Sequence, residues 1–111
     1  MTLIYKICSL ELWESAKIEG YFYGADIDIQ DGFIHCCSAL QIAETLSLHF
    51  SGVPNLMLLT IDSSTLDIKW EPARAGEMFP HLYNFLPLSS VTKAEPIAIN
   101  DDGFHLLLNQ P

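Results

Sequence analysis

Hydrophobic residues along the chain fall into short runs of strand length. Strands are expected at 3–7, 56–62, 67–71 and 91–99, the last with a proline that marks an edge or a break. The run at 56–62 is almost wholly apolar, which is typical of a central strand buried on both faces. Turn residues at 100–103 predict a hairpin onto a last strand at 104–108.

Two stretches have helical spacing instead. The first runs from about Leu10 to Glu19, with Ser9 as N-cap and a glycine directly after it. The second runs from Ala39 to about Phe50, with apolar residues on one face. Strands that bracket two helices predict an α+β fold, a compact domain of mainly antiparallel sheets with two helices.

Two polar segments are expected to lie outside these elements. The three aspartates Asp26, Asp28 and Asp31 are interpreted as part of a solvated connection, and 72–80 is interpreted as a loop. The aromatic stretch 21–24 is either a short strand or the wall of a binding site.

Length and charge narrow the function classes. At 111 residues with 50% hydrophobic residues, positions 1–111 are expected to form a single domain with a real core. Fourteen acidic against five basic residues give a net charge of −9, which disfavours nucleic acid as a partner because the surface repels phosphate. Neither a signal peptide nor a membrane span is recognisable, and three cysteines, two of them adjacent, suggest free thiols. We therefore expect a cytoplasmic protein, with the oligomeric state left open.

The segment 31–38 concentrates the most chemistry in the fewest residues. It reads Asp-Gly-Phe-Ile-His-Cys-Cys-Ser, a turn followed by a short buried strand and a helix cap. Ser38 and Gln41 have the spacing of a capping box. His35 therefore lies where a strand passes into a helix, and it is either a ligand contact or a core histidine bonded to the backbone.

Further polar and aromatic residues follow in the second half of the chain. An arginine can bind phosphate through two bonds, aromatic rings can stack on a base, and a glutamate can stabilise positive charge on a sugar. Together they suit a nucleotide or sugar-phosphate site in which the rings of His35 and His81 share one cleft. The catalytic candidates are His35, Glu71 and Glu77, and the ligand-binding candidates are Ser38, Trp70, Arg74, His81 and Tyr83.

The same residue types also occur in metal sites and in cysteine-dependent active sites. Zinc would need pairs such as Cys-x-x-Cys or His-x-x-x-His, which the sequence lacks, so no metal is expected. A nucleophilic cysteine would need a cationic neighbour, and the alternation of side chains turns one of Cys36 and Cys37 into the core.

Several motifs, in order, resemble a known family. Gly-Phe-Ile-His-Cys-x-Ser, Trp-Glu-Pro and Gly-Glu-x-Phe-Pro-His-Leu-Tyr are similar to those of the bacterial family called domain of unknown function 952, over nearly the whole chain. The chain departs from the family pattern at Cys37 and Ser38, which stand where serine and threonine are usual. Ala75 and Asn84 stand where glycine is usual, and Asn84 is expected to tolerate the positive φ of a turn.

That family is similar in fold to the ADP-ribosyltransferases. The resemblance implies an ADP-ribosyltransferase-like fold, NAD or a related nucleotide as ligand, and transfer or cleavage of ADP-ribose, with His35 at the nicotinamide ribose. It leaves open whether Tyr83 or Trp70 is the stacking aromatic, and whether Glu71 or Glu77 is the acid. The alternatives are a non-catalytic module that binds a small ligand or a protein segment, and a purely structural clasp of 70–83.

Overall fold

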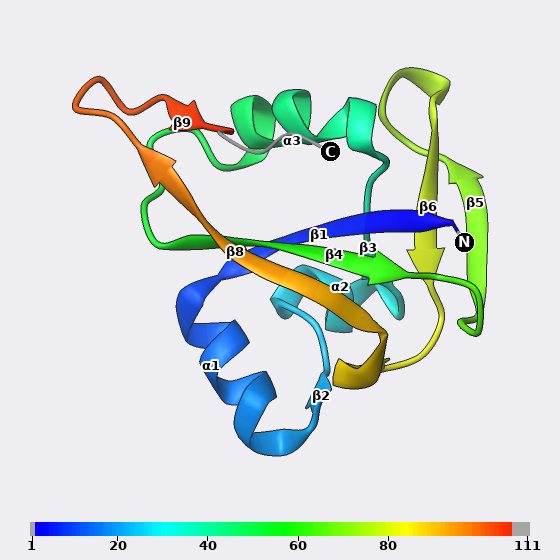
Figure 1. The fold of residues 1–111 in the computed structure, drawn as a ribbon. Helices are drawn as coiled ribbons and strands as arrows, with labels where there is room; N and C mark the ends of the chain where they lie inside the picture. Colours follow the sequence, from blue (N-terminus) through cyan, green and yellow to red (C-terminus); the bar gives the residue numbers. More distant parts are fainter. Residues whose placement is uncertain (1, 108–111) are drawn as a thin grey trace.

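The computed structural model describes residues 2–107 and contains three antiparallel sheets (Figure 1). The largest has the strand order β1 (Leu3–Ser9), β4 (Leu56–Asp62), β8 (Val91–Ile99) and β9 (His105–Leu106). A second sheet has the order β3 (Ile34–His35), β6 (Met78–Leu82) and β5 (Ile68–Pro72), and a third pairs β2 (Tyr21–Phe22) with β7 (Leu86–Pro87). The predicted α+β class with mainly antiparallel sheets is confirmed.

Helices cover both faces of the largest sheet. Helix α1 (Leu10–Glu19) and the short α2 (Asp26–Asp31) lie on one side, and α3 (Ile42–His49) lies on the other (Figure 1). Three 3₁₀ turns, at Ala39–Gln41, Arg74–Gly76 and Leu88–Ser90, complete the elements. None of the helices in residues 2–107 has the length and apolarity to span a membrane.

The two predicted helices form where the sequence placed them. The Ser9 hydroxyl accepts the Leu12 N–H at 3.1 Å, and Gly20 ends α1 in the left-handed conformation with φ +87°. The second helix begins with the 3₁₀ turn, where Gln41 Oε1 accepts the Ser38 N–H at 2.9 Å. The bond from the Ser38 N–H to the Gln41 side chain is the one that the predicted capping box requires.

Strand β4 is buried on both faces, as its apolar sequence predicts. Met57, Leu59 and Ile61 pack with α1 residues in one core cluster, and Leu56 and Leu58 pack with α3 residues in the other. Strand β8 is continuous through its proline, and within residues 2–107 no strand pairs with Pro96 on the side away from β4, because β9 pairs only with Ala98–Ile99. The edge interpretation of that proline is thus confirmed.

Three expectations about the connections were wrong. The aspartate-rich segment is not a solvated connection but the helix α2, and Asp28 in it is 2% exposed. The loop expected at 72–80 is much shorter, because β5 continues to its end at Pro72 and β6 begins at Met78. The left-handed conformation falls on Ala75, with φ +55°, whereas Asn84 is not among the positive-φ residues.

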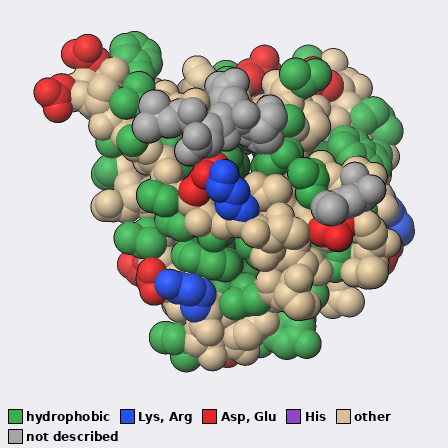
Figure 2. Space-filling model, in the orientation of Figure 1, with side chains coloured by type: hydrophobic (Ala, Val, Ile, Leu, Met, Phe, Trp, Pro, Cys, Tyr) green, Lys and Arg blue, Asp and Glu red, His purple; other side chains and the backbone are tan. Residues whose placement is uncertain are grey.

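At the end of the chain, the turn at 100–103 closes a hairpin between β8 and β9, and acidic side chains project from its tip (Figure 2). Of the strand expected at 104–108, only His105–Leu106 forms, and Leu108 lies outside the described residues.

Candidate functional site

The β3–β6–β5 sheet presents one polar and aromatic surface, the histidine face. His35 and His81 are directly paired across β3 and β6, so their side chains leave the sheet on the same side, with ring centroids 5.6 Å apart. The ring of Phe33 stacks on His81 at 4.2 Å and lies 4.6 Å from His35 and 5.2 Å from Tyr83. Both imidazoles therefore lie on the same side of the sheet, which a shared site for the two rings requires.

The imidazole of His81 lies between Phe33 and a carboxylate. Its Nδ1 is 2.8 Å from Glu71 Oε1, and the Tyr83 hydroxyl donates to the same oxygen at 2.6 Å. The hydrogen bond from Tyr83 lowers the pKa of Glu71 most, and the bond from His81 lowers it further. The bond to Glu71 in turn raises the pKa of Tyr83. Glu71 is therefore a carboxylate at neutral pH, and Tyr83 keeps its proton.

The imidazole of His35 is hydrogen-bonded to a buried carboxylate instead. Asp28 Oδ1 is 2.7 Å from His35 Nδ1 and accepts the His35 backbone N–H at 3.0 Å. Asp28 Oδ2 accepts the Ala25 N–H at 2.8 Å and lies 3.0 Å from the ammonium of Lys6, which is itself 6% exposed. The Lys6 ammonium also donates to the His35 carbonyl at 2.8 Å.

Burial by itself raises the pKa of Asp28, but the bonds from His35 and Ala25 and the charge of Lys6 outweigh it and lower that pKa to about 2. An ionised carboxylate only accepts hydrogen bonds, so the His35 nitrogen that faces it must carry a proton. Asp28 thereby fixes both the ring orientation and the protonated nitrogen of His35.

The backbone makes room for this carboxylate at Gly24. A Cβ at that position would lie 2.8 Å from the Asp28 Cβ and 3.3 Å from Oδ2, and the φ of +109° strains any other residue. The segment 24–28 is thus shaped around the Asp28 side chain.

A second polar group lies in a hollow of about 330 Å³. Arg74 Nε is 2.8 Å from Glu44 Oε1, and the guanidinium lies over the Phe79 ring at 4.8 Å. Gln41 Nε2 donates to Glu77 Oε1 at 2.7 Å and to the Met78 carbonyl at 2.9 Å. The hollow is lined by Ser38, Leu40, Gln41, Glu44, Arg74 and Glu77.

The eight candidates from the sequence therefore divide among three places. His35, Glu71, His81 and Tyr83 gather on the histidine face, and Ser38, Arg74 and Glu77 gather in the hollow. Trp70 pairs with Pro80, one position away from both Glu71 and His81, so its side chain leaves β5 on the opposite side. The structure does not bring all eight candidates into one cleft.

Sequence reasoning missed the residues that hold His35. Lys6 and Asp28 make the buried ion pair, and Phe33 joins the two imidazoles. Lys6 carried the signal: a charge among Ile4, Tyr5 and Ile7, in a strand buried on both faces, requires an acidic partner elsewhere in the chain.

The cysteines have no part in either group. Burial raises the pKa of Cys8 and Cys36 to about 12 and that of Cys37 to about 11, so all three are protonated at neutral pH. This favours their role as small core residues over that of a nucleophile.

The chain is similar to other proteins over almost its whole length. Residues 7–94 match the family described as "Protein of unknown function (DUF952)". The crystal structure of protein CC0527 from Caulobacter crescentus is 42% identical in sequence, with a TM-score of 0.89 over 96% of this chain and 95% of that one.

A crystal structure of a double mutant of CC0527 gives the same values. Its solution NMR structure is 45% identical, with a TM-score of 0.82 over 93% of this chain and 90% of that one. A search of the curated proteins finds no match. The chain belongs to the DUF952 family of proteins of unknown function.

Proposed function

We propose that the histidine face binds NAD or a related nucleotide through its ribose and base, and that the protein transfers or cleaves ADP-ribose. The observation that carries the proposal is the cross-strand pair of His35 and His81, with Glu71 bonded to His81. A partly exposed imidazole beside aromatic rings and an ionised carboxylate supplies what a ribosyl group needs in order to react. The ADP-ribosyltransferase-like fold belongs to the same proposal, through the resemblance of the motifs.

In this reaction the bond between the ribose C1′ and the nicotinamide nitrogen breaks. Its electron pair neutralises the pyridinium nitrogen, which leaves positive charge on the ribose. A water molecule or an acceptor hydroxyl then bonds to C1′ and releases a proton. His35 orients the ribose, and Glu71 stabilises the developing charge.

The geometry favours Glu71 over Glu77 for this role, and Tyr83 over Trp70 for stacking. Glu71 and Tyr83 are bonded to each other beside His81, whereas Glu77 is bonded to Gln41 in the hollow and Trp70 lies across the sheet. A phosphate group that reached the hollow would meet Arg74, the one arginine of the chain.

A second candidate is a non-catalytic module that binds a small ligand or a protein segment at the same face. The contacts of Arg74 favour this second candidate, because its guanidinium is already paired with Glu44 and hydrogen-bonded to Thr45 at 3.4 Å. In that case the ligand would gain little from the arginine.

Thermal unfolding with NAD or ADP-ribose tests the binding. Either ligand is expected to stabilise the folded protein by about 2.7 kcal/mol at a concentration of a hundred times Kd, and so to raise Tm. His35→Ala is expected to abolish this rise. His49→Ala is the matched control, because His49 is exposed at the end of α3. No shift with any nucleotide at millimolar concentration would refute the proposal.

Mass spectrometry of released nicotinamide separates the enzyme from the module. For an enzyme, Glu71→Gln is expected to lower the release about 10²-fold or more while Tm stays close to that of the wild type. Ligand binding with no release by the wild type would leave the module as the function.

A further inference from the structure

The imidazole of His35 has a carboxylate next to each ring nitrogen, and the two carboxylates differ in burial. Asp28 lies behind Nδ1 and is 2% exposed. Asp31 Oδ2 lies 3.0 Å from Nε2, and the two side chains of that pair are 38% and 35% exposed. Asp28 is therefore fixed in the core, whereas the carboxylate of Asp31 covers the nitrogen that a ligand would reach.

The fold does not explain the carboxylate of Asp31. It is the last residue of α2, and the negative end of a helix dipole disfavours an acidic side chain there. The helix already ends properly at Gly32, whose N–H donates to the Asp28 carbonyl at 2.9 Å. An exposed ion pair also adds little stability. The residue is thus available for a role at His35.

The charges around Nε2 determine which ligand group fits. Lys6, the buried ammonium next to His35, is bonded to Asp28 and to the His35 carbonyl, so it offers nothing to a ligand. A phosphate that approached Nε2 would meet the charge of Asp31 at close range. A hydroxyl or an amide, by contrast, carries no net charge and can donate to the carboxylate of Asp31.

We propose that Asp31 is a specificity-determining residue of the histidine face: it admits neutral groups with both a donor and an acceptor, such as sugar hydroxyls, and keeps phosphate away from His35. This rests on the proposed function, because it names which part of the ligand meets His35. Like-charge rejection of a competing group is a common source of specificity.

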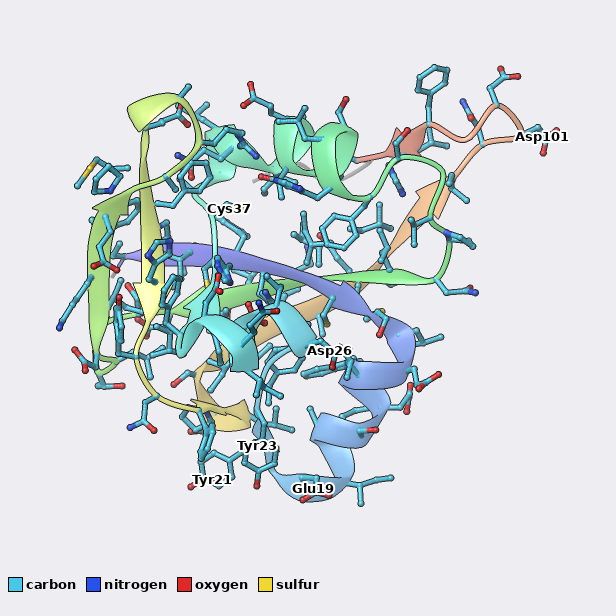
Figure 3. The ribbon with its side chains drawn as sticks, turned by 180° about the vertical axis from the view of Figure 1, so that it is seen from behind. Glu19, Tyr21, Tyr23, Asp26, Cys37 and Asp101 are labelled. Carbon is cyan, nitrogen blue, oxygen red and sulfur yellow. The ribbon has the colours of Figure 1, made fainter. Side chains whose placement is uncertain are left out.

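The test compares Asp31→Asn with Asp26→Asn. Both variants remove one negative charge from α2, but Asp26 lies at the end of the helix that points away from β3 and β6 (Figure 3). Inorganic phosphate is titrated against each ¹⁵N-labelled protein, and binding is followed on the His35 ring nitrogens by NMR. Asp31→Asn is expected to bind phosphate at His35 about ten-fold or more tightly than wild type and Asp26→Asn.

Equal phosphate binding by the two variants would overturn the role of Asp31, and so would strong phosphate binding at His35 in the wild type. A parallel titration with ADP-ribose separates the two proposals. If ADP-ribose fails to bind the wild type, the proposed function fails, while the phosphate comparison still decides whether Asp31 excludes anions. If it binds, Asp31→Asn is expected to weaken it, and Asp26→Asn is not.

Discussion

The two imidazole–carboxylate pairs of the histidine face have the same chemistry in different surroundings. His35 is bonded to Asp28, which lies in the core with Lys6 and two backbone N–H groups around it. His81 is bonded to Glu71, which is partly exposed and shares its oxygen with Tyr83. A buried carboxylate with several fixed donors cannot move without a large cost, whereas a partly exposed one can exchange partners with a ligand.

This difference gives the two carboxylates different structural roles. The Asp28 network joins β1, α2 and β3, so it determines how His35 is presented. The Glu71 pair is confined to β5, β6 and the residue after β6, and the fold does not depend on it in the same way. Substitutions that remove one negative charge from each pair test whether the fold depends more on Asp28 than on Glu71.

The largest expected effect is that of Asp28→Asn. The substitution leaves the buried ammonium of Lys6 without its counter-charge, which typically costs about 3–5 kcal/mol. Urea unfolding at neutral pH measures the loss. Glu71→Gln is the matched control, with the same loss of charge next to a histidine, and its effect on stability is expected to be much smaller. Similar losses for both variants would abolish the distinction between the two pairs.

The next effect is that of Gly24→Ala, which tests the space around Asp28. The new Cβ would lie 2.8 Å from the Asp28 Cβ in a backbone conformation with φ +109°, so we expect a loss of about 2–4 kcal/mol. Gly32→Ala is the control, because its φ is +83° but no atom lies within 4 Å of a Cβ there. Its expected loss is about 1–2 kcal/mol, from conformation alone. Equal losses would mean that the approach of Asp28 is not a constraint.

The smallest expected effect is the loss of folding stability at acidic pH. The pKa of Asp28 is lowered from 3.8 to about 2, so its ionisation stabilises the fold above its unfolded pKa and the gain is lost as pH falls through about 2. Asp28 alone should then contribute about 2 kcal/mol that disappears between roughly pH 5 and 2. Urea unfolding across this range measures it. A stability that is flat below pH 4 would contradict the lowered pKa.

Much of the fold could be read from local pattern. The cap at Ser9 and the glycine after Glu19 placed α1, because capping acts within a few residues. The apolar run of β4 predicted burial on both faces for the same local reason. Asp28 was misplaced because three aspartates in six residues indicate a solvated segment unless a distant cation is known.

For the candidate site too, local sequence pattern predicted some features, and long-range contacts determined the others. The residue types, the junction at His35 and the motifs of the family are all evident from the sequence. The folded chain was needed to see that His35 and His81 share a face, that Arg74 and Glu77 lie in a separate hollow, and that the Trp70 side chain lies on the opposite side of the sheet. Strand pairing and register set these relations, and they depend on long-range contacts between segments that the sequence keeps far apart.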